Sequence, residues 1–293
     1  MKKSFYLMAF AAIMLAFVSC SKDDDDNNNN ETPKESTLDA PQYKEDAVRL
    51  SLPSNELTVS GENANVSLIE LAESGTYLIA YQRRVTRADD GTEYLTGKFT
   101  KNGDSYNLSG FATVTITGKS GTTYNIVVKT TDGTTTELNA TAASGGVSSG
   151  AMTDNLCRTW KIESTLLTVN VDGLNAGKEF PGTCDLNKMI EYAKEKGVKI
   201  KDIVDGKSIV TGITFSRAGT FMISYQNGKP DVGKWNWSSQ SAGTLSYGWN
   251  SSDMGNSLEN GAATVSFEGK KCKLTLGATV DNHQIQVIYT LGY

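Results

Sequence analysis

Residues that could carry acid–base or nucleophilic chemistry are few in this 293-residue sequence. It contains one histidine, His283, so a multi-histidine metal site is excluded and any serine–histidine pair would depend on that side chain. Gly146 to Gly150 match the Gly-x-Ser-x-Gly pattern of a nucleophile elbow, but that pattern acts only between a strand and a helix. The stretch from Thr141 to Ala151 consists of Ala, Ser, Gly and Thr apart from Val147. We interpret it as a linker and expect no hydrolase of this kind.

Carboxylates offer a second route to chemistry, because two of them about 5–10 Å apart across a cleft can hydrolyse a glycosidic bond. Four are spread over the second half of the chain: Glu163, Glu179, Asp231 and Glu268. The sequence brings no two of them together, and most acidic residues on β-proteins lie on solvated faces. Glycoside hydrolysis is therefore our third hypothesis, and we assign no catalytic residue, cofactor or metal.

The four cysteines are Cys20, Cys157, Cys184 and Cys272, and their spacing matches neither a zinc ribbon nor a redox Cys-x-x-Cys motif. Three remain beyond Cys20, which permits one disulfide and one free thiol. Cys272 alternates with apolar residues and is expected in the core. If a disulfide forms, Cys157 with Cys184 is the expected pair.

An aromatic cluster is the best candidate for ligand binding. Trp235, Trp237, Tyr247 and Trp249 occupy alternating positions on two consecutive predicted strands, so their rings share one face within cross-strand reach. On an open groove or rim, these rings would offer flat apolar surfaces to a sugar or a lipophilic ligand. On an interior face they would fill the core, and both alternatives stay open.

The elements that must position these rings are strands. Apolar residues alternate with polar ones through most of the second half of the chain, which predicts an all-β fold with one buried and one wet face, as in antiparallel barrels or sandwiches. The alternating runs include Phe221–Tyr225, Trp235–Trp237, Leu245–Trp249, Cys272–Leu276 and Ile285–Leu291.

One predicted helix, Cys184 to Lys196, interrupts the strands. Thr183 is the expected N-cap and Gly197 the expected stop. We expect the helix to cover a barrel end, with partner docking as the alternative. Its apolar stripe comprises Leu186, Met189, Ile190 and Ala193.

Two parts of the chain resemble each other. Ile69 to Gln82 and Ile213 to Gln226 share six of fourteen residues without a gap, and Gly75 and Gly219 fall at matching hairpin turns. We predict two antiparallel β domains, residues 41–140 and 152–293, joined by a linker over 141–151. The first is a small β-sandwich or a reduced barrel. Looser likenesses pair Gly97-Lys98-Phe99 with Gly233-Lys234-Trp235, and Ala112-Thr113-Val114 with Ala263-Thr264-Val265.

Three short segments carry a family resemblance for the second domain: Arg158-Thr159-Trp160-Lys161, Gly219-Thr220-Phe221 and Gly233-Lys234-Trp235. They resemble the lipocalin-like domains of bacterial lipoproteins, over about residues 151 to 293. The resemblance implies a lipocalin-like barrel. Arg158 stands where lipocalins have the Gly of Gly-x-Trp, and the last strand lacks the basic residue that packs over that Trp.

The N-terminus is typical of an export signal. Lys2 and Lys3 precede an apolar run from Phe5 to Val18, which has the length of a signal-peptide core and is too short to span a bilayer comfortably. Val18-Ser19-Cys20 resembles a lipobox. The resemblance implies that residues 1–19 are removed and that Cys20 carries the lipid that holds the protein to the membrane.

An acidic segment follows Cys20. Ser21-Lys22 and then Asp23 to Asp26 resemble the export signal of Bacteroidetes-type surface lipoproteins, which implies the outer membrane, facing the cell exterior. The alternative is a solvated acidic linker without address content. Residues 20–40 contain too few apolar side chains to fold and are expected to form a tether.

Charge excludes nucleic acid as a partner. Removing residues 1–19 leaves 26 basic and 33 acidic residues, a formal charge of −7. Phosphate backbones are bound by clustered Lys and Arg, whereas the one basic cluster, Lys194 to Lys201, is interleaved with Glu195 and fits a solvated helix end.

These observations together predict a non-enzymatic, surface-exposed lipoprotein. Our first hypothesis is a ligand-binding module for a glycan or a small apolar ligand. The alternative is an accessory subunit that docks on another protein of the outer membrane, which a wide apolar surface patch would favour.

Overall fold

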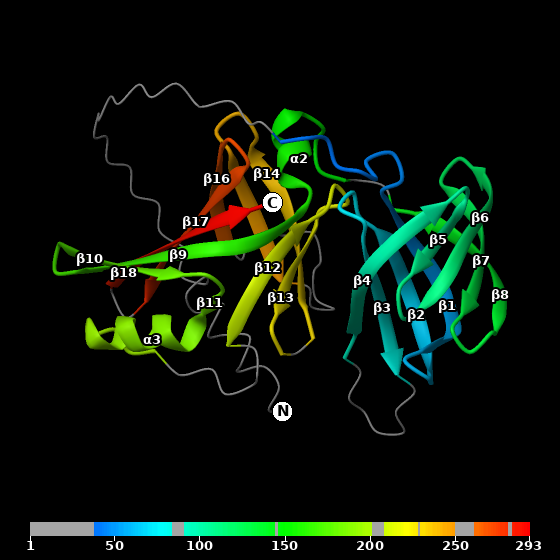
Figure 1. Cartoon of the computed structure of the whole chain (residues 1–293), viewed down its shortest axis with the longest axis horizontal. Helices are drawn as coiled ribbons and strands as arrows, with labels where there is room; N and C mark the ends of the chain where they lie inside the picture. Colours follow the sequence, from blue (N-terminus) through cyan, green and yellow to red (C-terminus); the bar gives the residue numbers. More distant parts are fainter. Residues whose placement is uncertain are drawn as a thin grey trace.

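The computed structural model of the protein describes residues 38–83, 91–143, 146–200, 208–227, 229–249, 261–280 and 283–293. The predicted signal peptide, Cys20 and the tether up to residue 37 lie outside these ranges. Figure 1 shows two β-barrels side by side, with the short helix α2 (Ala151–Leu156) between them in the chain. No helix within the described ranges has the length and apolar character needed to cross a bilayer.

The first barrel is a closed meander of eight antiparallel strands, in which each strand pairs with its chain neighbours and β1 pairs with β8. Of the two predicted alternatives, a barrel is therefore correct, and it is complete. Its strands are β1 (Val48–Val59), β2 (Glu62–Leu71), β3 (Thr76–Arg83), β4 (Glu93–Asn102), β5 (Ser105–Leu108), β6 (Ala112–Ser120), β7 (Thr123–Thr130) and β8 (Thr135–Ala142).

The second barrel repeats this meander, closed by pairing of its first two barrel strands, β9 and β12. Two further strands extend the sheet outside the barrel, β10 beside β9 and β11 beside β12. The predicted all-β fold with a lipocalin-like second domain is confirmed. The strands are β9 (Thr159–Val171), β10 (Leu174–Pro181), β11 (Cys184–Asp185), β12 (Ile209–Phe215), β13 (Thr220–Tyr225), β14 (Asp231–Ser239), β15 (Thr244–Trp249), β16 (Gly261–Glu268), β17 (Lys271–Val280) and β18 (His283–Gly292).

Helix α3 (Leu186–Glu195) lies between β11 and β12, where a helix was predicted, but it begins later. Cys184 and Asp185 form β11, and the N-cap is Asp185 instead of Thr183. The Asp185 carboxylate accepts hydrogen bonds from the backbone N–H groups of Asn187 and Lys188, at 3.1 and 3.3 Å, as an N-cap should. The apolar stripe of α3 joins the core of the second barrel.

Strand register shows that the two barrels are equivalent. Ile69 pairs with Ile79 in the β2–β3 hairpin, and Ile213 pairs with Ile223 in the β12–β13 hairpin, so the predicted hairpin repeat is confirmed. Both hairpins contain the same irregularity three residues before that pair, and both turns have a glycine with positive φ, at Gly75 and Gly219.

The likeness between Ala112-Thr113-Val114 and Ala263-Thr264-Val265 does not follow the strand register, because the two segments are offset by two residues. Leu108 pairs with Ala112 in the first barrel, whereas its counterpart Tyr247 pairs with Gly261 in the second. Ala112 therefore corresponds to Gly261, and the matching Ala-Thr-Val segments are not equivalent in the fold.

Each barrel has its own buried core, and all three described cysteines lie in the second. Cys157, Cys184 and Cys272 are free thiols, so the disulfide considered between Cys157 and Cys184 is not formed. A smaller apolar cluster joins the barrels. It comprises Leu68, Leu78 and Ala80 from the first barrel, and Met222 and Val232 from the second.

Candidate functional site: a polar cleft on the second barrel

The predicted aromatic cluster faces the barrel interior where its side chains are described. Trp235 and Tyr247 are buried, and the Trp235 indole N–H donates to the Ser216 carbonyl at 3.1 Å. Trp237 is half-buried, lies edge-on to Trp235 at 5.4 Å, and donates to the Thr153 hydroxyl on α2 at 2.8 Å. The backbone of Trp249 pairs with Gly233, and its side chain is outside the described part. Of the two roles considered, the described rings take core packing.

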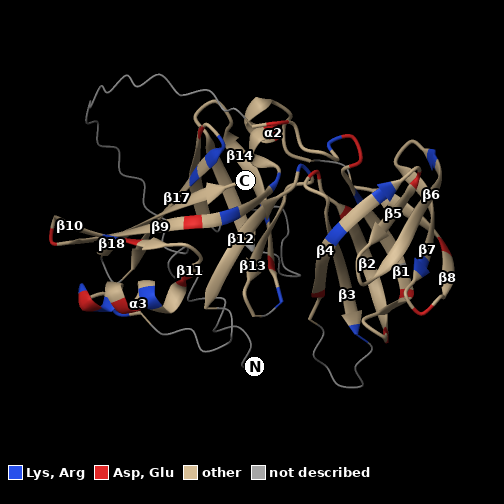
Figure 2. Ribbon diagram, viewed as in Figure 1, with Lys and Arg blue, Asp and Glu red and all other residues tan. Residues whose placement is uncertain are grey.

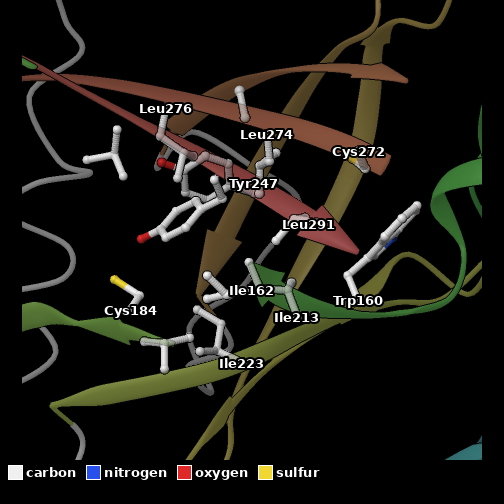
Figure 3. Close-up of a cluster of buried hydrophobic side chains, with 14 of the residues drawn as sticks. Trp160, Ile162, Cys184, Ile213, Ile223, Tyr247, Cys272, Leu274, Leu276 and Leu291 are labelled. Atoms are coloured by element: carbon white, nitrogen blue, oxygen red, sulfur yellow. The ribbon is translucent and has the colours of Figure 1, made fainter. Parts of the chain in front are cut away.

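The interior of the second barrel leaves little room for a ligand. Its cavity has a volume of about 30 Å³, enough for one or two water molecules, whereas small-ligand sites span about 300–1,000 Å³. Figure 3 shows apolar side chains from several strands, with Tyr247 among them, converging on this interior. A lipophilic ligand would have to displace these side chains.

Trp160, the tryptophan of the lipocalin-like motif, is covered by Arg158. In lipocalins the covering basic residue comes from the last strand. The Arg158 guanidinium lies 5.6 Å from the Trp160 ring centroid and 4.6 Å from that of Tyr293, at the chain end. Arg158 thus supplies the basic group that is missing from the last strand. It also donates to the carbonyl oxygen of Asp39 at 3.1 Å, which fixes the end of the predicted tether to this barrel.

The remaining chemical candidates do not form a site. The described strand before the Gly146–Gly150 segment, β8, ends at Ala142, and α2 starts at Ala151, so the segment is not the sharp strand-to-helix turn of a nucleophile elbow. His283 starts β18 opposite Val280. No group of three or more potential metal ligands occurs among the described residues. The four carboxylates considered for glycosidase chemistry lie on four different strands: Glu163 on β9, Glu179 on β10, Asp231 on β14 and Glu268 on β16. Glu163 and Glu268 both interact with Lys271, Glu163 through an ion pair of 2.9 Å, and all three of these side chains are exposed.

A polar cleft of about 360 Å³ lies on the second barrel, over β10, β9, β18 and β17. We call it the amide cleft, because the side chains of its described lining residues include four amides and two hydroxyls and none that is charged. The strands bring these groups together although they are far apart in sequence. The lining residues are Thr168, Asn170, Asn175, Gly277, Ala278, Thr279, Gln284, Ile285 and Gln286.

Strand register arranges the amide cleft in two rows. The first runs across four strands as successive pairs, Asn175, Asn170, Gln284 and Thr279. The second, two residues away and so on the same face, is Gly177, Thr168, Gln286 and Gly277. Glycine at both ends of the second row keeps the surface low there. The residues between the rows on β9 and β18, Val169 and Ile285, are buried in the core, so both rows face outward.

Asn170 is held in a fixed orientation at the centre of the first row. Its amide N–H donates to the Asn175 side-chain oxygen at 2.8 Å, and its own oxygen accepts from the Gly173 backbone N–H at 3.1 Å. Gln284, Gln286 and Thr279 are exposed and make no side-chain hydrogen bond with another described residue. The side-chain amides of Gln284 and Gln286 each offer two donor hydrogens and one acceptor oxygen to a ligand.

The next outward-facing row adds an apolar margin to the amide cleft. Leu166 pairs with Ile288, and both side chains are partly exposed. A ligand in the cleft would therefore meet neutral hydrogen-bonding groups beside a small aliphatic surface. This combination suits a polyhydroxylated ring, which has polar edges and apolar C–H faces.

A second cleft, of about 300 Å³, lies between the barrels and is lined by the basic residues Lys44, Arg49 and Arg217. Each is already paired: Lys44 and Arg217 with Asp154, and Arg49 with Glu70 at 3.0 Å. These side chains join the barrels, and we assign no ligand to them.

Comparison with protein-family models and with curated proteins finds no match to this chain. The fold and the two clefts are therefore the basis for assigning a function. The amide cleft was missed in the sequence, although the alternation of Gln284, Ile285 and Gln286 was a signal: the exposed positions carry uncharged amides.

Proposed function

We propose that the protein is a non-enzymatic binding protein for glycans, anchored by a lipid on Cys20 at the outer face of the outer membrane. The amide cleft is the observation that supports this proposal. Its neutral side chains offer no counter-charge to an ionic ligand, and paired donors and acceptors suit the hydroxyl groups of a sugar. A glycan is favoured over an apolar ligand because the cavity inside the second barrel has a volume of only about 30 Å³.

The position of the amide cleft supports an outward-facing role. Arg158, which holds Asp39 at the end of the tether, lies just before β9, and Thr168 lies near the other end of that strand. Ten residues of extended strand span roughly 30 Å. The cleft is thus at the opposite end of β9 from the tether.

The charge distribution agrees with a neutral ligand. In the ribbon view of Figure 2, Lys and Arg are interspersed with Asp and Glu on both barrels.

The test is binding of neutral oligosaccharides to the full lipoprotein in detergent, first on an array and then by calorimetry. Asn170→Ala and Gln284→Ala should each weaken binding about tenfold, the equivalent of one lost hydrogen bond of roughly 1.4 kcal/mol. Asn139→Ala is the matched control, because Asn139 is an exposed strand amide on the first barrel.

The same variants separate the competing hypotheses. Glycan binding that is unaffected by both cleft substitutions would contradict the amide cleft as the site. Failure to bind any glycan, together with capture of a defined outer-membrane protein, would favour the accessory-subunit hypothesis.

A further inference from the structure

The surface between the two barrels is polar as well as apolar, and its polar contacts form two groups of three. In the first group, Arg49 donates to the Glu70 carboxylate at 3.0 Å and to the Thr220 hydroxyl at 2.5 Å. Thr220, from the second barrel, also donates to Glu70 at 2.8 Å. Glu70 and Thr220 are fully or almost fully buried.

The second group has the same arrangement with the barrels exchanged. The Thr159 hydroxyl hydrogen-bonds to that of Thr214 at 3.0 Å and to that of Thr76, from the first barrel, at 3.2 Å. Both Thr76 and Thr214 are buried.

Strand register makes the two groups equivalent residue by residue. Arg49 pairs with Glu70 between β1 and β2, as Thr159 pairs with Thr214 between β9 and β12. Thr76 and Thr220 close the two matching hairpin turns through backbone bonds to Ala72 and Ser216. Each barrel therefore brings the same three positions to the joint. The contact of Arg49 with Thr220 is matched by that of Thr159 with Thr76, as in an interface with two-fold symmetry.

Positions near the axis of such an interface must face their own counterparts, and two pairs do so. Leu78 and its counterpart Met222 share the apolar cluster between the barrels. Glu73 and its counterpart Arg217 also meet. The Arg217 backbone N–H donates to the Glu73 carboxylate at 3.1 Å, and the Arg217 Nε lies 3.8 Å from the same oxygen.

We infer that this surface, formed by β1–β3 of the first barrel and by β9, β12 and β13 of the second, is a self-complementary barrel-binding surface whose partner is selected by Glu73 and Arg217. Pairing of two first barrels from separate chains would place Glu73 against Glu73. Pairing of two second barrels would place Arg217 against Arg217. At pH 8, where both Glu73 and Arg217 are ionised, like charges buried together disfavour both arrangements, so each barrel pairs with the unlike barrel.

The inference predicts that charge exchange redirects the pairing. Arg217→Glu gives a chain whose two surfaces are both acidic, and Glu73→Arg gives one whose surfaces are both basic. At pH 8, each variant alone should lose the fixed joint, and a broad-specificity protease should cleave residues 143–150 about tenfold faster or more, because cleavage follows the population of the open form. Mixed together, the two variants should form a 1:1 complex with twice the monomer mass by light scattering.

Two further variants keep the result interpretable. The double variant Glu73→Arg/Arg217→Glu should regain a monomer that resists the protease better than either single variant, although it also loses the ion pair between Arg217 and Asp154. Reversal of an exposed ion pair remote from the interface, Glu163→Lys/Lys271→Glu, is the matched control and should behave as wild type.

Circular dichroism of each variant establishes that both barrels are folded. The milder variants Glu73→Gln and Arg217→Gln should loosen the joint less than the charge reversals do. The inference is overturned if the double variant is no more resistant than the single ones. It is equally overturned if the mixture stays monomeric, or if either variant pairs with itself as readily as with the other.

Discussion

At the scale of single residues, the protein places a buried carboxyl group with a raised pKa in the joint between the barrels. Glu73 is fully buried, and this burial raises the pKa of its carboxyl group to about 7, despite the opposing effects of hydrogen bonds and of the Arg217 charge. The charge of Glu70 adds to the rise in the Glu73 pKa. Cys157 interacts electrostatically with Glu73, Glu70 and Arg158. The joint is therefore sensitive to pH.

We expect the free energy of unfolding to fall as pH rises from about 4.5 to above 7. The folded state retains the Glu73 proton up to about pH 7, whereas the unfolded chain releases it near 4.5. The folded state thus binds more protons between these values, and ionisation in place costs about 3 kcal/mol. Urea unfolding of wild type and Glu73→Gln at pH 4.5 and pH 8 measures this, with the difference between the two proteins changing with pH. A constant difference would contradict the assignment.

A second residue-scale feature is the packing of aromatic rings over strand glycines. Tyr77 covers Gly97, and its counterpart Phe221 covers Gly233. A Cβ added at Gly97 would lie 2.6 Å from a Tyr77 ring carbon, while Tyr77 is buried and held by its hydroxyl bond to the Ser109 carbonyl. The ring has nowhere to move.

We therefore expect Gly97→Ala to lower the free energy of unfolding by about 2 kcal/mol, the usual cost of overpacking in a core. Gly91→Ala is the control, because a Cβ there meets no atom within 4 Å. Thermal unfolding of the two variants distinguishes them. Equal melting temperatures would show that the strand shifts to accommodate the methyl group.

At the scale of elements, the β10–β11–α3 insertion distinguishes the second barrel from the first. The Phe180 ring, near the end of β10, lies edge-on to Tyr192 on α3 at 6.4 Å, and Lys178 lies over both rings. This packing holds β10 next to β9, and β10 supplies Asn175 to the amide cleft. The insertion thus builds one wall of the candidate site.

The N-cap of α3 provides a test of how much this helix contributes to stability. Asp185→Ala removes the acceptor for two backbone N–H groups and should destabilise the protein by about 1 kcal/mol, whereas Asp185→Asn should retain most of the cap. Chemical denaturation compares the three proteins. No loss in the alanine variant would mean that tertiary packing alone holds the helix.

Local pattern predicted the strands and hairpins well, because alternation such as that of Phe221, Ile223 and Tyr225 is a property of neighbouring residues. Closure of the first barrel was left open, because it depends on pairing of Leu50 with Ala142, far away in the chain. The alternation of Gln284, Ile285 and Gln286 indicated exposed amides, but only the register of four strands shows that they form a cleft with Asn170 and Asn175. Whether the tryptophans lie inside or outside the barrel was left open for the same reason. Alternating positions place the rings on one face of the sheet, and only closure of the barrel determines which face is interior.

At the scale of the whole molecule, the proposed anchor and address concern residues outside the described ranges and depend on Cys20. Cys20→Ala should release the protein from the membrane, because the substitution removes the thiol that carries the proposed lipid. Fractionation of cells that express each form measures this, and a variant that still partitions into the membrane would refute lipidation.

Surface exposure is tested separately on intact cells. Protease added outside should remove the folded part of the wild-type protein while a periplasmic control protein stays intact. Protection of the folded part would contradict the outward-facing proposal.

The contact between Arg158 and Asp39 has a mechanical consequence. The chain passes from the tether to the second barrel, where Leu38 packs against the core and Asp39 is held, before it enters the first barrel. Tension between a ligand in the amide cleft and the membrane would therefore run along β9 to Arg158 and into the tether. The first barrel lies off this path, so drag on a bound ligand need not unfold it or open the joint.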